Sequence, residues 1–211
     1  MAPNLLGMKI GHRAMRGDAR RLADLMGRLA NGDQRADAAR RAAIGSFADK
    51  LCAGIHHHHT AEDAVLWPVI VRSAGDAVDL SELTDDHAQL DPLLEEIRRA
   101  AAVLKNDPSA AVRLATGLAA LADLLDEHIE EEERLIFPII EKYVSEEDWE
   151  LVEQAVRKGG DIAFDLPRIG QYATEPELGE LRRLAGPLLS LVLVLLRPGH
   201  RRRQQLIFGT A

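Results

Sequence analysis

The chain has 211 residues, of which 46% are hydrophobic and only 4% aromatic, and its formal net charge is −8. This length and hydrophobic content are typical of one globular domain with a full core. The acidic balance argues against a protein that binds nucleic acid, because such proteins carry an excess of Lys and Arg. One cysteine, Cys52, leaves no intramolecular disulfide, and we therefore expect a cytoplasmic protein.

Apolar residues recur at helical spacing in four long segments that are separated by turn residues such as Asn31-Gly32-Asp33 and Pro108. We predict helices over residues 5–29, 34–71, 81–104 and 109–143. Short connections between long helices favour antiparallel neighbours. The sequence therefore predicts an all-α protein, with an up-down-up-down four-helix bundle over residues 1–143.

The remaining residues, 144–211, are assigned to a C-terminal helical extension that packs on the bundle or mediates an oligomer contact. A fifth helix is predicted over residues 146–158, because Ser145 can cap its first turn. Gly159-Gly160 can end this helix. The Pro and Gly residues that follow predict a loop and then a short helix through Leu196. These loop residues are Pro167, Gly170, Pro176 and Gly179.

The end of the extension joins an apolar segment, 184–196, to a basic one, 197–203. The apolar segment is shorter than the ~20 residues that span a membrane as a helix. One interpretation is a helix packed across the bundle with a solvated basic end, and we favour it. The alternative is a contact with a second copy of the chain or with an anionic membrane surface. We expect no membrane partner, and a homo-oligomer formed through the extension stays open.

Two segments of the predicted bundle repeat one pattern 70 residues apart. Residues 58–70 read HHTAEDAVLWPVI, and residues 128–140 read HIEEEERLIFPII. Each places a Glu four residues after a His, as in His58 with Glu62 and His128 with Glu132. Residues at this spacing lie one turn apart on the same helix face. Both side chains of each pair can therefore reach one metal site in the core.

Two further histidines, His12 and His87, fall on the first and third predicted helices, so every helix of the bundle brings at least one. Counted from the loops at 1.5 Å per residue, His12 and His58 lie at similar heights, as do His87 and His128. The second and third helices agree less well, by ~12 Å. A helix that ends or bends near Pro68 would reduce this mismatch.

With these residues the sequence resembles the hemerythrin HHE cation-binding family, over about residues 12–143. The resemblance rests on the segments 58–63 and 128–133 and on the histidines of the other two helices. It implies two iron ions, bridged by an oxo or hydroxo group and by Glu62 and Glu132. It also implies that His12 and His58 bind one iron and that His87 and His128 bind the other. Imidazole and carboxylate suit iron, although manganese or a mixed pair stays open.

The sequence departs from the oxygen carriers of that family, which have a fifth histidine in an HxxxH pair on the third helix. Here Asp91 stands four residues after His87. Asp91, His59, Glu133 or water could fill the position. We take a shortage of imidazole to favour the activation of oxygen or peroxide over reversible oxygen carriage.

Three functions follow from the resemblance. The first, which we favour, is a diiron oxidase or peroxide-consuming oxidoreductase acting on a small molecule. The second is reversible binding of O2 or NO, for storage, delivery or sensing. The third is an iron-responsive module, in which the metal orders the bundle and a partner reads that order. The expected partners are thus O2, peroxide or NO.

Overall fold

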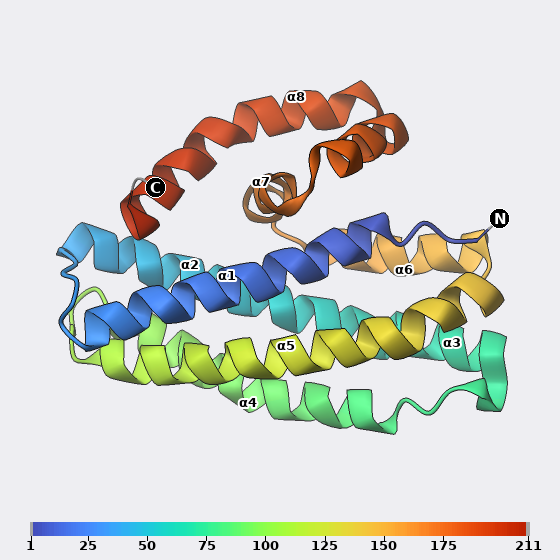
Figure 1. Ribbon diagram of the computed structural model, residues 1–211, viewed down its shortest axis with the longest axis horizontal. Coiled ribbons are helices and arrows are strands. Elements are labelled where there is room, and N and C mark those ends of the chain that lie inside the picture. The colour runs from blue at the N-terminus through green and yellow to red at the C-terminus, as the bar shows by residue number, and fades with distance from the viewer. Residues whose placement is uncertain (1, 210–211) are drawn as a thin grey trace.

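The computed structural model describes residues 2–209, and the regular structure of this part is helical throughout. Four helices lie side by side as a bundle (Figure 1): α1 (Leu6–Ala30), α2 (Ala38–Ala61), α4 (Ser81–Val103) and α5 (Ala110–Tyr143). α1 packs against α5, α5 against α4, and α4 against α2, each pair antiparallel. The predicted all-α fold with an up-down-up-down bundle is confirmed.

The second predicted helix continues beyond α2 as a π-helical turn, η1 (Glu62–Leu66), and then as α3 (Trp67–Ala74). In the π turn the amide of Trp67 donates to the carbonyl of Glu62, five residues earlier. Pro68 lies in the first turn of α3, where its missing amide hydrogen is tolerated. The segment therefore does not end near this proline, and it reaches Ala74.

The height difference between the second and third helices of the bundle is taken up by the connection after α3. A short 3-10 turn, η2 (Gly75–Ala77), is followed by the extended residue Val78. This connection runs back along the bundle before α4 begins (Figure 1). The loop between α3 and α4 therefore accounts for the mismatch in height that the sequence predicted between the second and third helices.

Two apolar clusters divide the interior of the bundle along its length. The larger contains Met15, Ile55, Leu90 and Leu125. The smaller contains Leu5, Leu66, Leu83 and Ile136. On each helical segment the histidines and glutamates of the repeated pattern fall between a member of one cluster and a member of the other. The candidate ligands therefore occupy a polar layer that is closed at both ends by apolar side chains.

Cys52 belongs to the larger cluster, with no exposed surface. Burial raises the pKa of its thiol to about 12. Because the thiolate is the nucleophile, we expect no alkylation of Cys52 by iodoacetamide at pH 8 in the native protein, and complete alkylation in denaturant. Mass spectrometry of both samples checks this, and fast native modification would contradict the buried position.

Three helices form the extension: α6 (Glu146–Gly159), α7 (Ile162–Tyr172) and α8 (Glu175–Phe208). The side chain of Ser145 caps α6 by accepting from the amide of Asp148, as predicted. The loop predicted after α6 is wrong, because its Pro and Gly residues lie inside α7 and α8. The short helix through Leu196 is wrong too, since α8 extends to Phe208 with a kink at Gly186.

The local reasons for these two helices lie in their caps and in one long-range contact. Thr174 and Glu177 form a capping box at the start of α8, where Pro176 occupies the first turn. Within α7, Pro167 cannot donate to the carbonyl of Ala163, and Arg203 from α8 donates to that carbonyl instead. A hydrogen-bond partner for the carbonyl that Pro167 leaves free therefore comes from 40 residues downstream.

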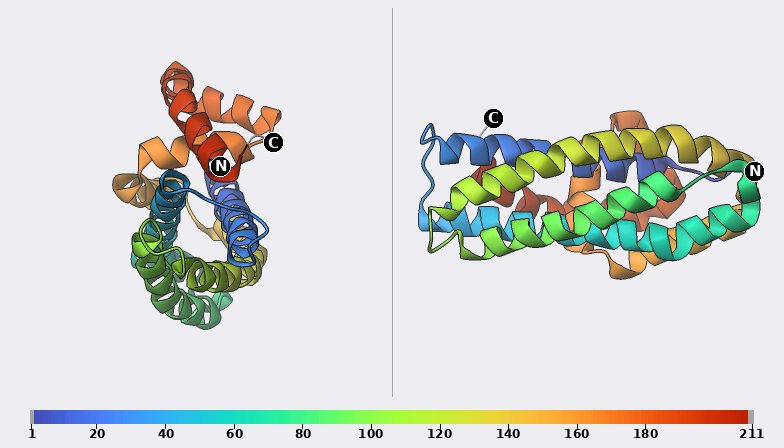
Figure 2. Two further views of the ribbon diagram at one scale, coloured as in Figure 1. Left: turned by 90° about the vertical axis from the view of Figure 1, so that its left-hand side faces the viewer. Right: turned by 90° about the horizontal axis from the view of Figure 1, so that it is seen from below.

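The extension covers one side of the bundle, over α1 and α2 (Figure 2). A buried ionic contact joins the two parts: Asp18 on α1 accepts from Arg168 (2.5 Å) and from the hydroxyl of Tyr172 (2.7 Å). Gly17 lies under the Tyr172 ring, where a Cβ would stand 2.3 Å from a ring atom. No helix within residues 2–209 is long and apolar enough to cross a membrane.

Candidate metal centre

The polar layer of the bundle contains two groups of potential metal ligands. The first, which we call the carboxylate cluster, consists of His12, His58, Glu62 and Glu132. The second, the imidazole cluster, consists of His59, His87 and His128. In each cluster one ligand atom per residue lies within 4.8 Å of every other. All six residues expected from the resemblance are thus brought together in the bundle core, and His59 joins them.

Of the three residues considered for the remaining position, His59 alone belongs to a cluster. Asp91 is 61% exposed and pairs with His56 on the surface, at 2.8 Å. Glu133 approaches the outer nitrogen of His12, with Oε1 3.0 Å from Nδ1. The consecutive histidines of α2 therefore divide between the clusters, with His58 in one and His59 in the other.

Carboxylates hold the outer nitrogens of three histidines. Besides the contact of Glu133 with His12, Asp63 lies 2.8 Å from Nδ1 of His87, and Asp86 lies 3.1 Å from Nδ1 of His128. A carboxylate can only accept, so each of these Nδ1 atoms carries the proton. The Nε2 atom of each neutral ring then presents its lone pair to the layer, as metal-binding histidines do.

The first indication of a cation site is that the Nε2 lone pairs of neighbouring histidines lie close to one another. Nε2 of His87 and Nε2 of His128 are 3.2 Å apart, and Nε2 of His12 and Nε2 of His58 are 3.0 Å apart. The protonated Nδ1 atoms of His87 and His128 leave no proton to join their Nε2 atoms. Two imidazoles that bind one ion at about 2.1 Å have separations of this size.

The buried glutamates give a second, independent sign. Both carboxylate oxygens of Glu62 and of Glu132 lack a hydrogen-bond partner, as does Nε2 of His59. Glu62 Oε1 lies 2.8 Å from Nε2 of His58, and its Oε2 lies 3.6 Å from Nε2 of His87. Glu62 therefore reaches both clusters. Two unpaired buried carboxylates are costly, and cations between them would remove this cost.

The pKa shifts of the side chains in the polar layer agree with a metal site. Burial raises the pKa of both Glu62 and Glu132 well above the usual range. Burial also lowers the pKa of His58 to about 3 and the pKa of His128 to about 4. The imidazoles of His58 and His128 are therefore neutral and free to bind a metal ion near neutral pH. The donor set of neutral imidazoles and carboxylates fits iron.

The repeated pattern includes residues whose contacts were not predicted from the sequence, although Glu133 was considered as a possible ligand. Asp63 and Glu133 occupy equivalent places in the two segments, and each contacts the single histidine of a neighbouring helix. Trp67 and Phe137 are also equivalent: Trp67 stacks on His87 and Phe137 on His12, with ring centroids 5.8 and 6.1 Å apart. The 70-residue offset was a signal that could have assigned these four residues.

Asp86 lies outside the repeated pattern, so the sequence did not identify it. Its contact with His128 can be tested by mutation. We expect Asp86→Ala to weaken metal binding by about 10- to 100-fold, because His128 loses the group that fixes its orientation. Asp85→Ala removes an exposed carboxylate from the adjacent position and is the matched control. Competition with a chelator of known affinity measures both, and equal affinities would remove Asp86 from the centre.

A pocket of about 210 Å³ between α1 and α5 reaches His12 of the centre. It is lined by His12, Glu133, Lys9, Arg13 and Arg16. The carboxylate cluster is thus the half of the centre that this pocket adjoins. It is also the half with one imidazole fewer.

Fold and site together define a metal-binding four-helix bundle with histidine and carboxylate donors in its core. The sequence matches the family model described as the hemerythrin HHE cation binding domain over residues 8–140. The chain belongs to this family. Comparisons with curated proteins and with solved structures found no match.

Proposed function

We propose that this protein binds two iron ions in the polar layer and that its ligand is molecular oxygen or a small relative, NO or peroxide. The observation that carries the proposal is the donor set of five imidazoles and two buried carboxylates. His59 restores the imidazole that the third helix lacks. The reason to disfavour reversible carriage, a shortage of imidazole, therefore loses its basis.

The burial of the centre favours a small ligand over an organic substrate. The ligand residues other than His58 are at most 5% exposed. Trp67 and Phe137 cover histidines of the two clusters and exclude water from that end of the layer. A pair of iron ions held here could transfer electrons to a bound oxygen species and take them back. We accordingly propose reversible binding of O2 or NO as the function that the site supports best.

The chain's own groups determine where such a ligand would bind. The imidazole cluster brings three histidines, and the carboxylate cluster brings two. If Glu62 and Glu132 were shared between two ions, an ion held by His12 and His58 would have one protein ligand fewer than an ion held by the imidazole cluster. Glu133 keeps the proton of His12 on Nδ1 and so directs the lone pair of Nε2 inward. The exchangeable position is therefore expected at His12 and His58.

A second candidate, consumption of peroxide, is favoured by the pocket at His12. Lys9 lines this pocket together with Glu133, so one side chain that can give up a proton lies beside the proposed exchangeable position, whereas the guanidinium groups of Arg13 and Arg16 keep their protons. Peroxide consumption requires protons for the water that forms. Lys9 is the member of this group that stands over the Phe137 ring.

The deciding experiment combines iron analysis with optical spectroscopy on protein purified with iron. We expect two irons per chain, and a coloured oxygen or NO adduct that persists and is reversed by removing the gas. A transient species that decays while peroxide or a reductant is consumed would replace reversible binding by the second candidate. Protein without stoichiometric metal would overturn both.

A further inference from the structure

The face of α8 that points away from the bundle is apolar. Leu188, Leu191, Val194 and Leu195 are between 57% and 68% exposed. Their spacing of three and four residues places them on one side of the helix after its kink. Leu193 on the opposite side is buried. Figure 1 shows α8 as the outermost helix of the extension, so this face has no cover within the described chain.

The same face becomes basic two turns further along. Arg201 follows Val194 by seven residues and Arg202 follows Leu195 by seven, so these exposed arginines continue the apolar stripe. Between Leu181 and the end of the chain there are six arginines and no acidic residue. The rest of the chain therefore carries the whole negative excess, whereas the part of α8 that follows Leu181 is purely basic.

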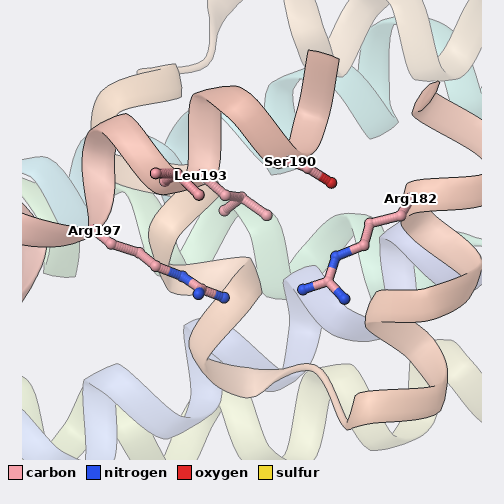
Figure 3. Close-up of a pocket in the computed structure, with 5 residues that line it drawn as sticks. Arg182, Ser190, Leu193 and Arg197 are labelled. Atoms are coloured by element: carbon pink, nitrogen blue, oxygen red, sulfur yellow. The ribbon is translucent and has the colours of Figure 1, made fainter. Parts of the chain in front are cut away.

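Two arginines also converge on a pocket that begins at the edge of this face and extends around the helix towards the buried Leu193 (Figure 3). Arg182 and Arg197 extend towards one another from opposite ends of a hollow of about 230 Å³, which is also lined by Ser190, Leu193 and Val194. Among the side chains that the structure describes, neither guanidinium forms an ion pair, whereas the neighbouring Arg183 approaches Glu180. Two unpaired guanidinium groups facing one hollow form a site for an anion such as a phosphate group.

We propose that α8 docks this protein on an anionic lipid surface, with a lipid phosphate between Arg182 and Arg197. Val194 connects the two features, because it lines the pocket and is also part of the exposed apolar face. A helix with an apolar face and flanking arginines lies in the plane of the membrane interface. Each arginine near an anionic surface contributes about 1 kcal/mol of attraction.

A second copy of the chain fits this surface less well. Four aliphatic side chains, each already part-buried, supply less than the ~800 Å² per partner of a standard protein interface. Pairing two copies of α8 would also bring together surfaces of the same positive sign, which disfavours association. A lipid surface needs only partial insertion of the apolar face, and it supplies the negative charge.

Sedimentation with vesicles tests the proposal on the full-length, iron-loaded protein. We expect binding to phosphatidylcholine vesicles that contain phosphatidylglycerol and not to phosphatidylcholine alone, with loss of binding at high salt. The double variant Arg182→Gln/Arg197→Gln is expected to bind about 30-fold more weakly. Its control is Arg99→Gln/Arg113→Gln, an equal charge change on α4 and α5, on the far side of the bundle from α8 (Figure 1).

The apolar face is tested separately with Leu191→Ser/Leu195→Ser, which is expected to abolish vesicle binding. Val112→Ser/Leu151→Ser changes two exposed apolar side chains outside α8 and should bind as the wild type does. All four positions are exposed, so circular dichroism should report unchanged helix content. Equal vesicle binding by the two double variants would contradict a role for α8.

Two further outcomes would overturn lipid docking in favour of another occupant. If inorganic phosphate binds by calorimetry and depends on Arg182 and Arg197 while anionic vesicles do not bind, the pocket is a site for a free anion. If light scattering finds a dimer that Leu191→Ser/Leu195→Ser dissociates, again without vesicle binding, the face is covered by a second copy. Because no iron ligand is involved, failure of this proposal leaves the proposed metal centre untouched.

Discussion

His59→Ala will reduce the iron content from two ions to about one per chain, although the rest of the repeated pattern is intact. His59 is buried, its Nε2 has no partner, and its ring stacks on His87 at 4.4 Å. Loss of a direct ligand should exceed the 10- to 100-fold loss of affinity that follows removal of a supporting carboxylate. Metal analysis after dialysis, together with a chelator titration, measures both quantities.

The run of histidines on α2 supplies the control for this experiment. His56→Ala removes an exposed imidazole three residues upstream in the same helix, where it contacts only Asp91 among the polar partners described. It should bind two irons with unchanged affinity. If His59→Ala binds two irons tightly and Asp91→Ala loses one, then Asp91 and not His59 fills the place of the fifth histidine.

Local sequence signals predicted most of the helix boundaries because caps act within a few residues. Ser145 identified the start of α6 correctly, and the turn residues after α1 and α4 separated the bundle helices within a residue or two. The start of the second helix was placed four residues too early, because Asp37 caps it through the amide of Arg40. Pro167 misled the prediction because Arg203, 36 residues later, stabilises the helix around it.

The composition of the site could be predicted only where one helix face carried the pattern. His and Glu at i and i+4 share a face whatever the neighbouring helices do, so His58 with Glu62 and His128 with Glu132 were recognisable. His59 points about 100° away from His58 around the helix axis. Whether a side chain in that direction can bind a metal ion depends on where α4 lies, which the sequence does not give. Asp86 was out of reach for the same reason, because its partner is on α5.

Removing the metal should destabilise this fold strongly, because the buried carboxyl groups of Glu62 and Glu132 lie beside each other and beside histidine nitrogens that serve as metal ligands, with no other polar partner among the described residues. An ion present at 1,000 times its dissociation constant contributes about 4 kcal/mol to stability. We therefore expect chelation to lower the melting temperature by roughly 10 °C or more in a chain of this size. Calorimetry with and without chelator measures the change.

A double substitution separates the two roles of these carboxylates. Glu62→Gln/Glu132→Gln should bind little iron, yet its metal-free form should be more stable than metal-free wild type by about 1–3 kcal/mol. The two amides can hydrogen-bond to each other, whereas two carboxylates require a shared proton or a cation. Glu127→Gln/Glu130→Gln, at exposed positions of the same helix as Glu132, should change neither iron content nor chelator sensitivity. A metal-free double variant less stable than metal-free wild type would mean that these glutamates serve packing, because their replacement is stabilising only where the buried carboxyl groups lack adequate partners.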